Sequence, residues 1–187
     1  MTFFVYLYLV IFILFDIFIL VFGVEQIMRI ACRKKRLAPA VPSSRRLRNA
    51  VIKQIAIEMP NVKTVLDIGS GWGTMGRTVA GAFPQAKILG MEIMPCPYVY
   101  SVIRGLFVRN AKFKFGNVFK YLEKSGDKFD VGTAYLLTPM MRDVQNYAKR
   151  FKVLIVLDFP LPDMKPNKKI KLHSDMLGQH WMYVYRF

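Results

Sequence analysis

A run of alternating glycines directly behind an acidic residue is the stretch of this sequence with the clearest chemistry. The apolar run from Val62 to Ile68 predicts a short buried strand before the glycines, and Met75 to Phe83 predicts a helix after them. The residues between them read Asp67-Ile68-Gly69-Ser70-Gly71-Trp72-Gly73-Thr74. Glycines let the chain turn sharply and let a ligand lie against the backbone without a Cβ in the way. A strand, a glycine turn and a helix N-terminus together form a site for an anionic or polar ligand.

The spacing of the glycines narrows the kind of ligand. The dinucleotide-binding fingerprint has a third glycine five residues after the first, and Thr74 stands at that position. A phosphate-binding loop ending in Gly-Lys-Ser or Gly-Lys-Thr is also absent from the sequence. The pattern Asp-x-Gly-x-Gly-x-Gly resembles motif I of the class I S-adenosylmethionine-dependent methyltransferases. The alternative is a tight strand-to-helix turn in another kind of α/β protein.

A second acidic residue closes the next predicted strand. Lys87 to Glu92 is a mainly apolar run, and Glu92 stands at its end. A carboxylate roughly 20 residues beyond the glycine motif, at the tip of the neighbouring strand, can accept hydrogen bonds from both hydroxyls of a ribose. An ordinary exposed glutamate is the alternative, which the position at the end of an apolar strand disfavours.

Strands and helices alternate along the rest of the chain. Helices are predicted over Arg45–Met59, Tyr98–Arg109 and Met140–Arg150, and strands over Lys112–Phe115, Phe129–Leu137, Val153–Leu157 and Gln179–Phe187. Lys165 to Lys171 is predicted to be a charged loop. The alternation predicts an α/β fold with a Rossmann-like, mostly parallel twisted sheet and helices on both faces. Ligands bind such sheets outside the carboxyl ends of the strands, where Asn117 and Tyr135 also fall.

Composition points to an anionic neighbour. The 187 residues carry a net charge of +16, which suits a membrane surface or a nucleic acid, and 53% of them are hydrophobic. Cys32 and Cys96 are the only cysteines, and two cysteines so placed make neither a metal site nor a disulfide framework. No metal ion is therefore predicted.

The hydrophobic excess lies at the N-terminus. Phe3 to Val24 is apolar except for Asp16, and about 20 apolar residues span the core of a bilayer. No small-residue cleavage site follows the run, so an uncleaved single-pass transmembrane anchor is predicted over residues 1–24. A basic, proline-containing linker is predicted over residues 25–44, and a catalytic domain over residues 45–187.

Basic residues crowd one side of the predicted anchor. They are Arg29, Arg33, Lys34, Lys35 and Arg36. Because lysines and arginines stay on the cytoplasmic side of a membrane, the catalytic domain is predicted to face the cytoplasm or the matrix of a mitochondrion. The same cluster is expected to bind anionic lipid headgroups.

From Pro39 to Phe187 the chain resembles a family of membrane-anchored class I protein-lysine methyltransferases, whose mitochondrial members modify the adenine nucleotide translocase and the c subunit of ATP synthase. The resembling stretches are Val41-Pro42-Ser43, Asp67-Ile68-Gly69-Ser70-Gly71, Gly90-Met91-Glu92-Ile93-Met94-Pro95, Tyr100-Ser101, Pro139-Met140-Met141, Phe159-Pro160-Leu161-Pro162 and Trp181-Met182-Tyr183. The resemblance implies S-adenosylmethionine as cofactor and lysine side chains of integral membrane proteins, near the bilayer surface, as methyl acceptors.

The resemblance also implies a set of site residues. The slot for the acceptor lysine would be lined by Tyr135, Thr138 and Pro139. The cofactor would be held by Asp67, Gly69, Ser70, Gly71, Gly73, Glu92 and Asn117. The chain departs from the family pattern at Trp72 and Asn117, where acidic residues are usual. Asparagine can still accept the hydrogen bond of the adenine amino group through its carbonyl oxygen.

Other activities stay open. One is a lipid, quinone or other small-molecule methyltransferase at the membrane, and another is a non-catalytic subunit that keeps the methyltransferase fold. A nucleic acid suits the charge, but the predicted anchor does not favour it. The segment after Tyr135 has neither an Asn-Pro-Pro-Tyr type motif nor a cysteine, which argues against methylation of adenine amino groups or of pyrimidine carbon 5.

Overall fold

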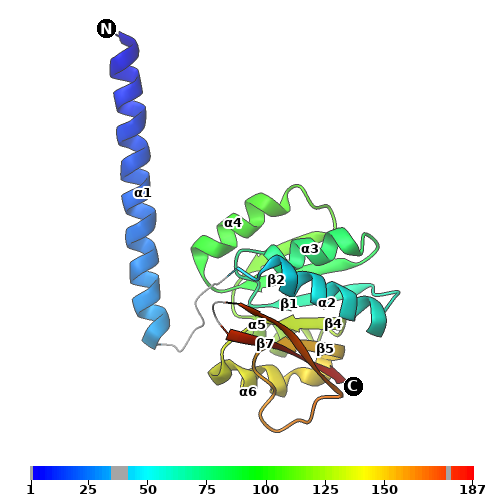
Figure 1. Ribbon diagram of the computed structural model, residues 1–187. Helices are drawn as coiled ribbons and strands as arrows, with labels where there is room; N and C mark the ends of the chain where they lie inside the picture. The colour runs from blue at the N-terminus through cyan, green and yellow to red at the C-terminus, as the bar shows by residue number, and fades with distance from the viewer. Residues whose placement is uncertain (1, 35–41, 176–177) are drawn as a thin grey trace. The chain divides into compact units, whose positions relative to one another are not determined.

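The computed structural model describes residues 2–34, 42–175 and 178–187, and the chain divides into two compact units, Met1–Pro39 and Ala40–Phe187 (Figure 1). The first unit contains one long helix, α1 (Thr2–Lys34). This helix continues past the predicted anchor into the predicted linker, because no proline interrupts residues 24–34. The side chains at residues 4–20 of α1 are exposed.

Within the described ranges, no helix is long and apolar enough to cross a membrane. The predicted transmembrane anchor therefore gains no support from the structure. Residues 35–41, which include Lys35 and Arg36 of the predicted basic cluster, lie outside the described residues.

The second unit is built on a seven-stranded sheet with the order β3-β2-β1-β4-β5-β7-β6 (Figure 1). The strands are β1 (Thr64–Ile68), β2 (Lys87–Glu92), β3 (Ala111–Phe115), β4 (Phe129–Ala134), β5 (Phe151–Leu157), β6 (Lys168–Asp175) and β7 (Gly178–Arg186). The first five strands pair in parallel, and β7 runs antiparallel to both of its neighbours. The predicted mostly parallel sheet is therefore confirmed.

Helices cover both faces of the sheet, as predicted. They are α2 (Arg45–Glu58), α3 (Thr74–Ala82), α4 (Pro95–Gly105), α5 (Val118–Ser125) and α6 (Thr138–Asn146). Figure 1 shows α2, α3 and α4 on one side of the sheet, with α5 and α6 on the other. Val51 and Ile55 of α2 and Val79 of α3 pack against alternate strand residues such as Val65 and Ile155. This packing fixes the carboxyl ends of β1, β2, β4 and β5 along one edge, since all four strands run in parallel.

The segment predicted to be a charged loop, Lys165 to Lys171, lies partly in strand β6. Ile170 and Leu172 pack against the core, while the ammonium group of Lys169 lies 4.3 Å from the centre of the Trp181 ring. Alternation of apolar and basic residues suits a strand with one buried face. The loop prediction holds for residues 165–167 and was wrong for Lys168 to Lys171, where lysines lie on both sides of the half-buried Ile170.

Helix α2 is tied to β6 and β7 by one buried carboxylate. Glu58 lies 2.6 Å from the Nε of Arg186 and 2.9 Å from the Nζ of Lys168. The hydrogen bond from Arg186 is the main reason that the pKa of Glu58 falls to about 2. Glu58 therefore stays ionised at any physiological pH and holds the first helix of this unit to its last two strands.

Candidate active site

Asp67 joins three elements at the carboxyl edge of the sheet. It is buried near the end of β1, where its Oδ1 accepts a 2.9 Å hydrogen bond from the hydroxyl of Thr133 in β4. Its Oδ2 accepts a 3.1 Å bond from the backbone N–H of Gly76 in α3. Burial raises the pKa of Asp67 to about 6, which the bonds from Thr133 and Gly76 oppose and the charge of Glu92 reinforces. The carboxylate is therefore mostly ionised at neutral pH, and keeping this charge buried lowers the free energy of unfolding.

This raised pKa predicts a pH dependence of stability. The folded protein binds the Asp67 proton more tightly than the unfolded chain between the ordinary pKa of 3.8 and the folded value of about 6. The free energy of unfolding should therefore fall as the pH rises through this window, by about 3 kcal/mol from this group. The Asp67→Asn variant should lack this decrease of the free energy of unfolding with pH. Urea denaturation of both proteins from pH 4 to pH 7 would measure the difference. Parallel curves for the two proteins would contradict the assignment.

The glycine loop needs glycine for two physical reasons. Gly69, Gly71 and Gly73 have φ values of 68°, 52° and 68°, a left-handed region that other residues rarely adopt. A Cβ on Gly69 would also lie 2.6 Å from the Cδ2 of Leu136, in the β4–α6 connection. The loop thus turns tightly from β1 into α3 and packs against the segment that carries Tyr135.

Glu92 holds the glycine loop from the side. It is 6% exposed, and its Oε2 accepts a 2.7 Å hydrogen bond from the N–H of Gly71. Its Oε1 accepts bonds of 2.8 Å and 2.7 Å from the N–H groups of Ile93 and Met94. Burial raises the pKa of Glu92, and these backbone bonds oppose that effect. A carboxylate offers about four acceptor positions, so one remains for a ligand hydroxyl.

Ser70 and Asn117 complete the predicted cofactor set. The Oγ of Ser70 is buried and has no hydrogen-bond partner in the part of the chain that the structure describes, which fits a group that meets a ligand. The Oδ1 of Asn117 caps α5 by accepting bonds of 2.8 Å and 3.2 Å from the N–H groups of Phe119 and Lys120. These bonds occupy the oxygen predicted to face adenine, so the side-chain NH2 of Asn117 is the group left to donate to a ring nitrogen.

The residues predicted to line the acceptor slot follow β4. Tyr135 is half-buried, whereas Thr138 and Pro139 are exposed and begin α6. Leu136 connects them to the glycine loop, because its Cδ2 lies 2.6 Å from the position that a Cβ on Gly69 would occupy. The structure thus brings the predicted acceptor segment against the glycine loop.

A pair that the sequence did not reveal lies at the carboxyl end of β5. Asp158 has a φ of 63°, and its Oδ2 lies 2.8 Å from the Nδ1 of the buried His180 in β7. Its Oδ1 accepts a 3.0 Å bond from the N–H of Trp181. The ring of His173 in β6 lies 5.3 Å from that of His180. Asp158 thereby ties the end of β5 to β7, and no local sequence pattern marks this long-range pair.

Trp72 stands where the family that the sequence resembles usually has an acidic residue. Its ring meets that of Tyr100 in α4 edge to face, with 5.4 Å between the ring centres. Its carbonyl accepts a 2.8 Å bond from the Nη1 of Arg77. Trp72 is thus held by contacts with α4 and α3, and Glu92 accepts its bond from the N–H of Gly71 next to it.

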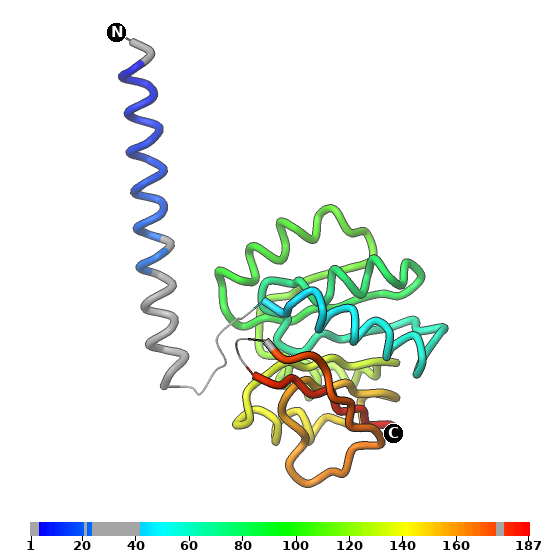
Figure 2. Tube along the Cα trace, in the orientation of Figure 1, coloured from blue at the N-terminus to red at the C-terminus, as the bar shows by residue number. Residues whose placement is uncertain are grey.

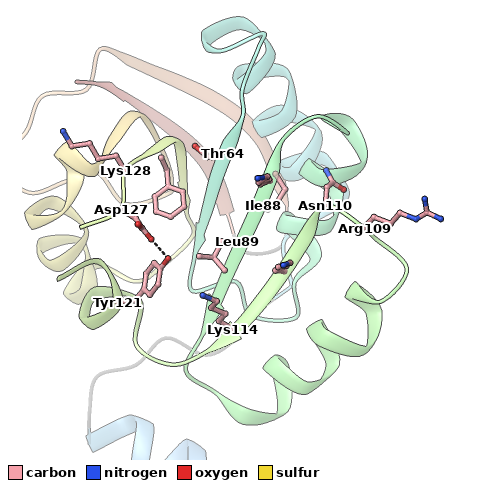
Figure 3. A pocket seen from close by; sticks show the side chains of 12 residues that line it. Thr64, Ile88, Leu89, Arg109, Asn110, Lys114, Tyr121, Asp127 and Lys128 are labelled. Carbon is pink, nitrogen blue, oxygen red and sulfur yellow. Dashed lines mark hydrogen bonds between the residues drawn. The ribbon is translucent and has the colours of Figure 1, made fainter. Parts of the chain in front are cut away.

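A separate cavity of about 540 Å³ lies near the amino ends of the strands (Figure 3). It is lined by Thr64, Lys87, Ile88, Leu89, Arg109, Asn110, Lys112, Lys114, Tyr121, Asp127, Lys128 and Phe129. Figure 3 shows Asp127 hydrogen-bonded to the hydroxyl of Tyr121. None of the predicted site residues lines this cavity, so its basic walls belong to a different part of the surface.

Comparison with known proteins agrees with this geometry. No family model matches the chain. A pluviatolide O-methyltransferase of Sinopodophyllum hexandrum is 27% identical over 74 residues, which are 40% of this chain and 18% of the length of that relative. The RNA methyltransferase of Salinibacter ruber, solved with S-adenosyl-L-homocysteine, aligns with a TM-score of 0.64 and 18% identity over 78% of this chain and 93% of that chain.

A further solved structure is similar. M. capricolum TrmK in complex with S-adenosyl-homocysteine aligns with a TM-score of 0.58 and 10% identity, over 73% of this chain and 67% of that chain. The chain therefore has the fold of the class I S-adenosylmethionine-dependent methyltransferases. The bound product in both solved structures agrees with the predicted cofactor.

Proposed function

We propose that this protein transfers a methyl group from S-adenosylmethionine to the side-chain amine of lysines in proteins at a membrane surface. The observation that carries the proposal is the buried carboxylate of Glu92, bonded to the N–H of Gly71 at the carboxyl edge of the sheet. A ribose that hydrogen-bonds to Glu92 would lie directly beside the glycine loop, where ligands of such sheets bind.

The residues of the chain have positioning roles in this reaction. The cofactor supplies a methyl group on a positively charged sulfur, which an amine can displace in line. Glu92 would hold the ribose, the glycine loop would let the cofactor lie against the backbone, and Tyr135 would form one wall of the slot. A lysine must be neutral to attack, and desolvation in a narrow slot lowers its pKa. Holding the two reactants in line then supplies most of the rate enhancement.

Three features support lysines at a membrane as acceptors. The chain resembles membrane-anchored protein-lysine methyltransferases in the stretches given above. Residues 135–139, which follow β4, contain no histidine, cysteine or carboxylate that could act as a general base. Methyl transfer to a neutral amine needs no such base. The net charge of +16 and the exposed apolar side chains at residues 4–20 suit association with an anionic membrane.

A small-molecule acceptor is the second candidate, which the 27% identity to an O-methyltransferase favours. A hydroxyl acceptor would need a general base, and His180 with its partner Asp158 forms an imidazole–carboxylate pair at the carboxyl end of β5. His180 is 3% exposed, so a substrate would reach it only after the β6–β7 hairpin moved. This requirement makes an amine the better acceptor.

Incubation of a membrane fraction with methyl-labelled S-adenosylmethionine and the purified protein tests the acceptor class. Label in lysines of membrane proteins is expected, and Glu92→Gln should not produce it. Label in the lipid extract would establish the small-molecule reading instead. Cofactor binding without any label would show that the fold has been kept without turnover.

A further inference from the structure

Helix α4 turns its large apolar side chains outward. Its buried positions, Pro97, Ser101 and Gly105, are small. On the opposite side, Val99 is 52% exposed and Ile103 is 54% exposed. A helix on a soluble domain usually directs its large apolar stripe at the core. In α4 the small residues face the core and the large apolar residues face outward.

The packing of Phe113 explains why the buried side is made of small residues. The Phe113 ring, from β3, lies 2.9 Å from the position of a Cβ on Gly73 and 2.5 Å from that on Gly90. It also lies 3.0 Å from the position of a Cβ on Gly105. One aromatic ring thus fills the space between α3, α4 and β2, and α4 packs closely over it. Nothing in this packing accounts for the apolar residues on the outer side.

The outward apolar surface continues past the end of the helix. We define the α4 surface as Val99, Tyr100, Ile103, Leu106 and Phe107. Leu106 is 76% exposed and Phe107 is 82% exposed. Both belong to the turn after α4, and Figure 2 traces the chain from this helix into β3. Contiguous exposed apolar side chains of this size mark a surface that binds a protein or a membrane.

The charges around the α4 surface select between these partners. Residues 93–122 contain no aspartate or glutamate. The exposed side chains of Arg104 and Arg109 lie on either side of Leu106 and Phe107 in the sequence, and Lys112 and Lys114 follow in β3. An apolar helix face flanked by cations, with aromatic residues and no acidic ones, is complementary to an anionic bilayer.

We infer that the α4 surface docks on an anionic lipid bilayer, with Leu106 and Phe107 entering the boundary between headgroups and acyl chains. Arg104 and Arg109 then lie among the lipid phosphates. Helix α4 runs from Pro95, three residues after Glu92, to Gly105, before the turn that leads to the amino end of β3. If α4 lies along the bilayer, with Val99 and Ile103 as well as Leu106 and Phe107 against the lipid, its first turn beside the cofactor edge also comes near the bilayer. Only this last step rests on the proposed function, because only there is the bilayer taken as the place where the protein meets its methyl acceptors.

Vesicle binding by residues 40–187 tests the docking surface without the contribution of α1. Among the residues that the structure describes, the buried hydrophobic side chains, from Leu47 to Tyr185, all lie in this unit, so it should fold on its own. The double variant Leu106→Ser with Phe107→Ser should lower partition onto phosphatidylcholine–phosphatidylglycerol vesicles by at least about tenfold. Arg104→Gln with Arg109→Gln should lower it by about fivefold for each charge removed. Phosphatidylcholine vesicles should abolish the effect of the arginine changes.

Ile57→Ser is the matched control, since Ile57 is an apolar residue of α2 that is 57% exposed outside the α4 surface. It should bind vesicles as the unaltered protein does. Each variant should keep its affinity for S-adenosyl-homocysteine, which shows that it is folded.

Unchanged vesicle binding by the folded Leu106→Ser, Phe107→Ser variant would overturn the inference. So would a dimer of residues 40–187 that this variant dissociates, because the surface would then bind a second copy. A vesicle result as expected, with no methyl transfer to any acceptor by the unaltered protein, would refute the proposed function and leave the docking surface in place.

Discussion

Replacing Glu92 with glutamine is expected to lower the affinity for S-adenosylmethionine more than a hundredfold. Glutamine keeps the shape of the side chain, but one of its two terminal groups becomes a donor. That donor must face the N–H of Gly71 or those of Ile93 and Met94, which now donate to the carboxylate. Each charge-assisted bond lost costs about 1.5–3 kcal/mol, and the proposed bond to the ribose would be weakened as well.

Calorimetric titration of the Glu92→Gln variant measures this loss directly. Glu123→Gln is the matched control, because Glu123 is an exposed glutamate of α5 whose neutralisation changes the net charge equally. The control should bind the cofactor like the unaltered protein. Equal affinities for the Glu92 variant and its control would remove Glu92 from the site.

Replacing Gly73 with alanine is expected to lower the free energy of unfolding by about 2–5 kcal/mol and to impair cofactor binding. The backbone of Gly73 has a φ of 68°, which costs a residue with a Cβ about 1–2 kcal/mol. The new Cβ would lie 2.8 Å from the Cβ of Ser101 and 2.9 Å from the ring of Phe113. Overpacking of this kind costs about 1–3 kcal/mol.

Gly81, in the helix that Gly73 caps, provides a control of opposite sign. A Cβ on Gly81 would meet no atom within 4 Å, and its φ is not in the left-handed region. Gly81→Ala should therefore stabilise the protein by about 0.5–1 kcal/mol, because alanine loses less backbone freedom on folding. Urea denaturation of both variants tests the pair. A Gly73→Ala protein as stable as the unaltered one would show that the loop can relax.

The site residues that could be predicted from the sequence are those whose position depends only on neighbouring residues in the chain. Asp67, the glycines and Glu92 stand at fixed distances from apolar runs, so their place at the carboxyl edge follows from strand polarity alone. The start of α4 was predicted at Tyr98, whereas it lies at Pro95, because proline is tolerated in the first turn of a helix. Such errors of a few residues leave the edge unchanged.

The parts that were missed depend on contacts between distant segments. The pairing of Asp158 with His180 joins residues that lie far apart in sequence, and neither has a neighbour pattern that announces the other. The sequence predicted α4 but not which side it buries, because Phe113 in β3 decides that. The Asn117 oxygen was predicted to face adenine, but it caps α5, a helix that had not been predicted.

Hydrogen–deuterium exchange with and without S-adenosylmethionine tests most directly whether the carboxyl edge of the sheet holds the cofactor. The cofactor should slow exchange in peptides that cover Gly69 to Gly73 and Glu92 to Met94, and it should not do so in the Glu92→Gln variant. Peptides lining the basic cavity, such as those covering Lys112 and Lys114, should be unaffected. Protection confined to the basic cavity, or none at the glycine loop at saturating cofactor, would contradict the proposed site.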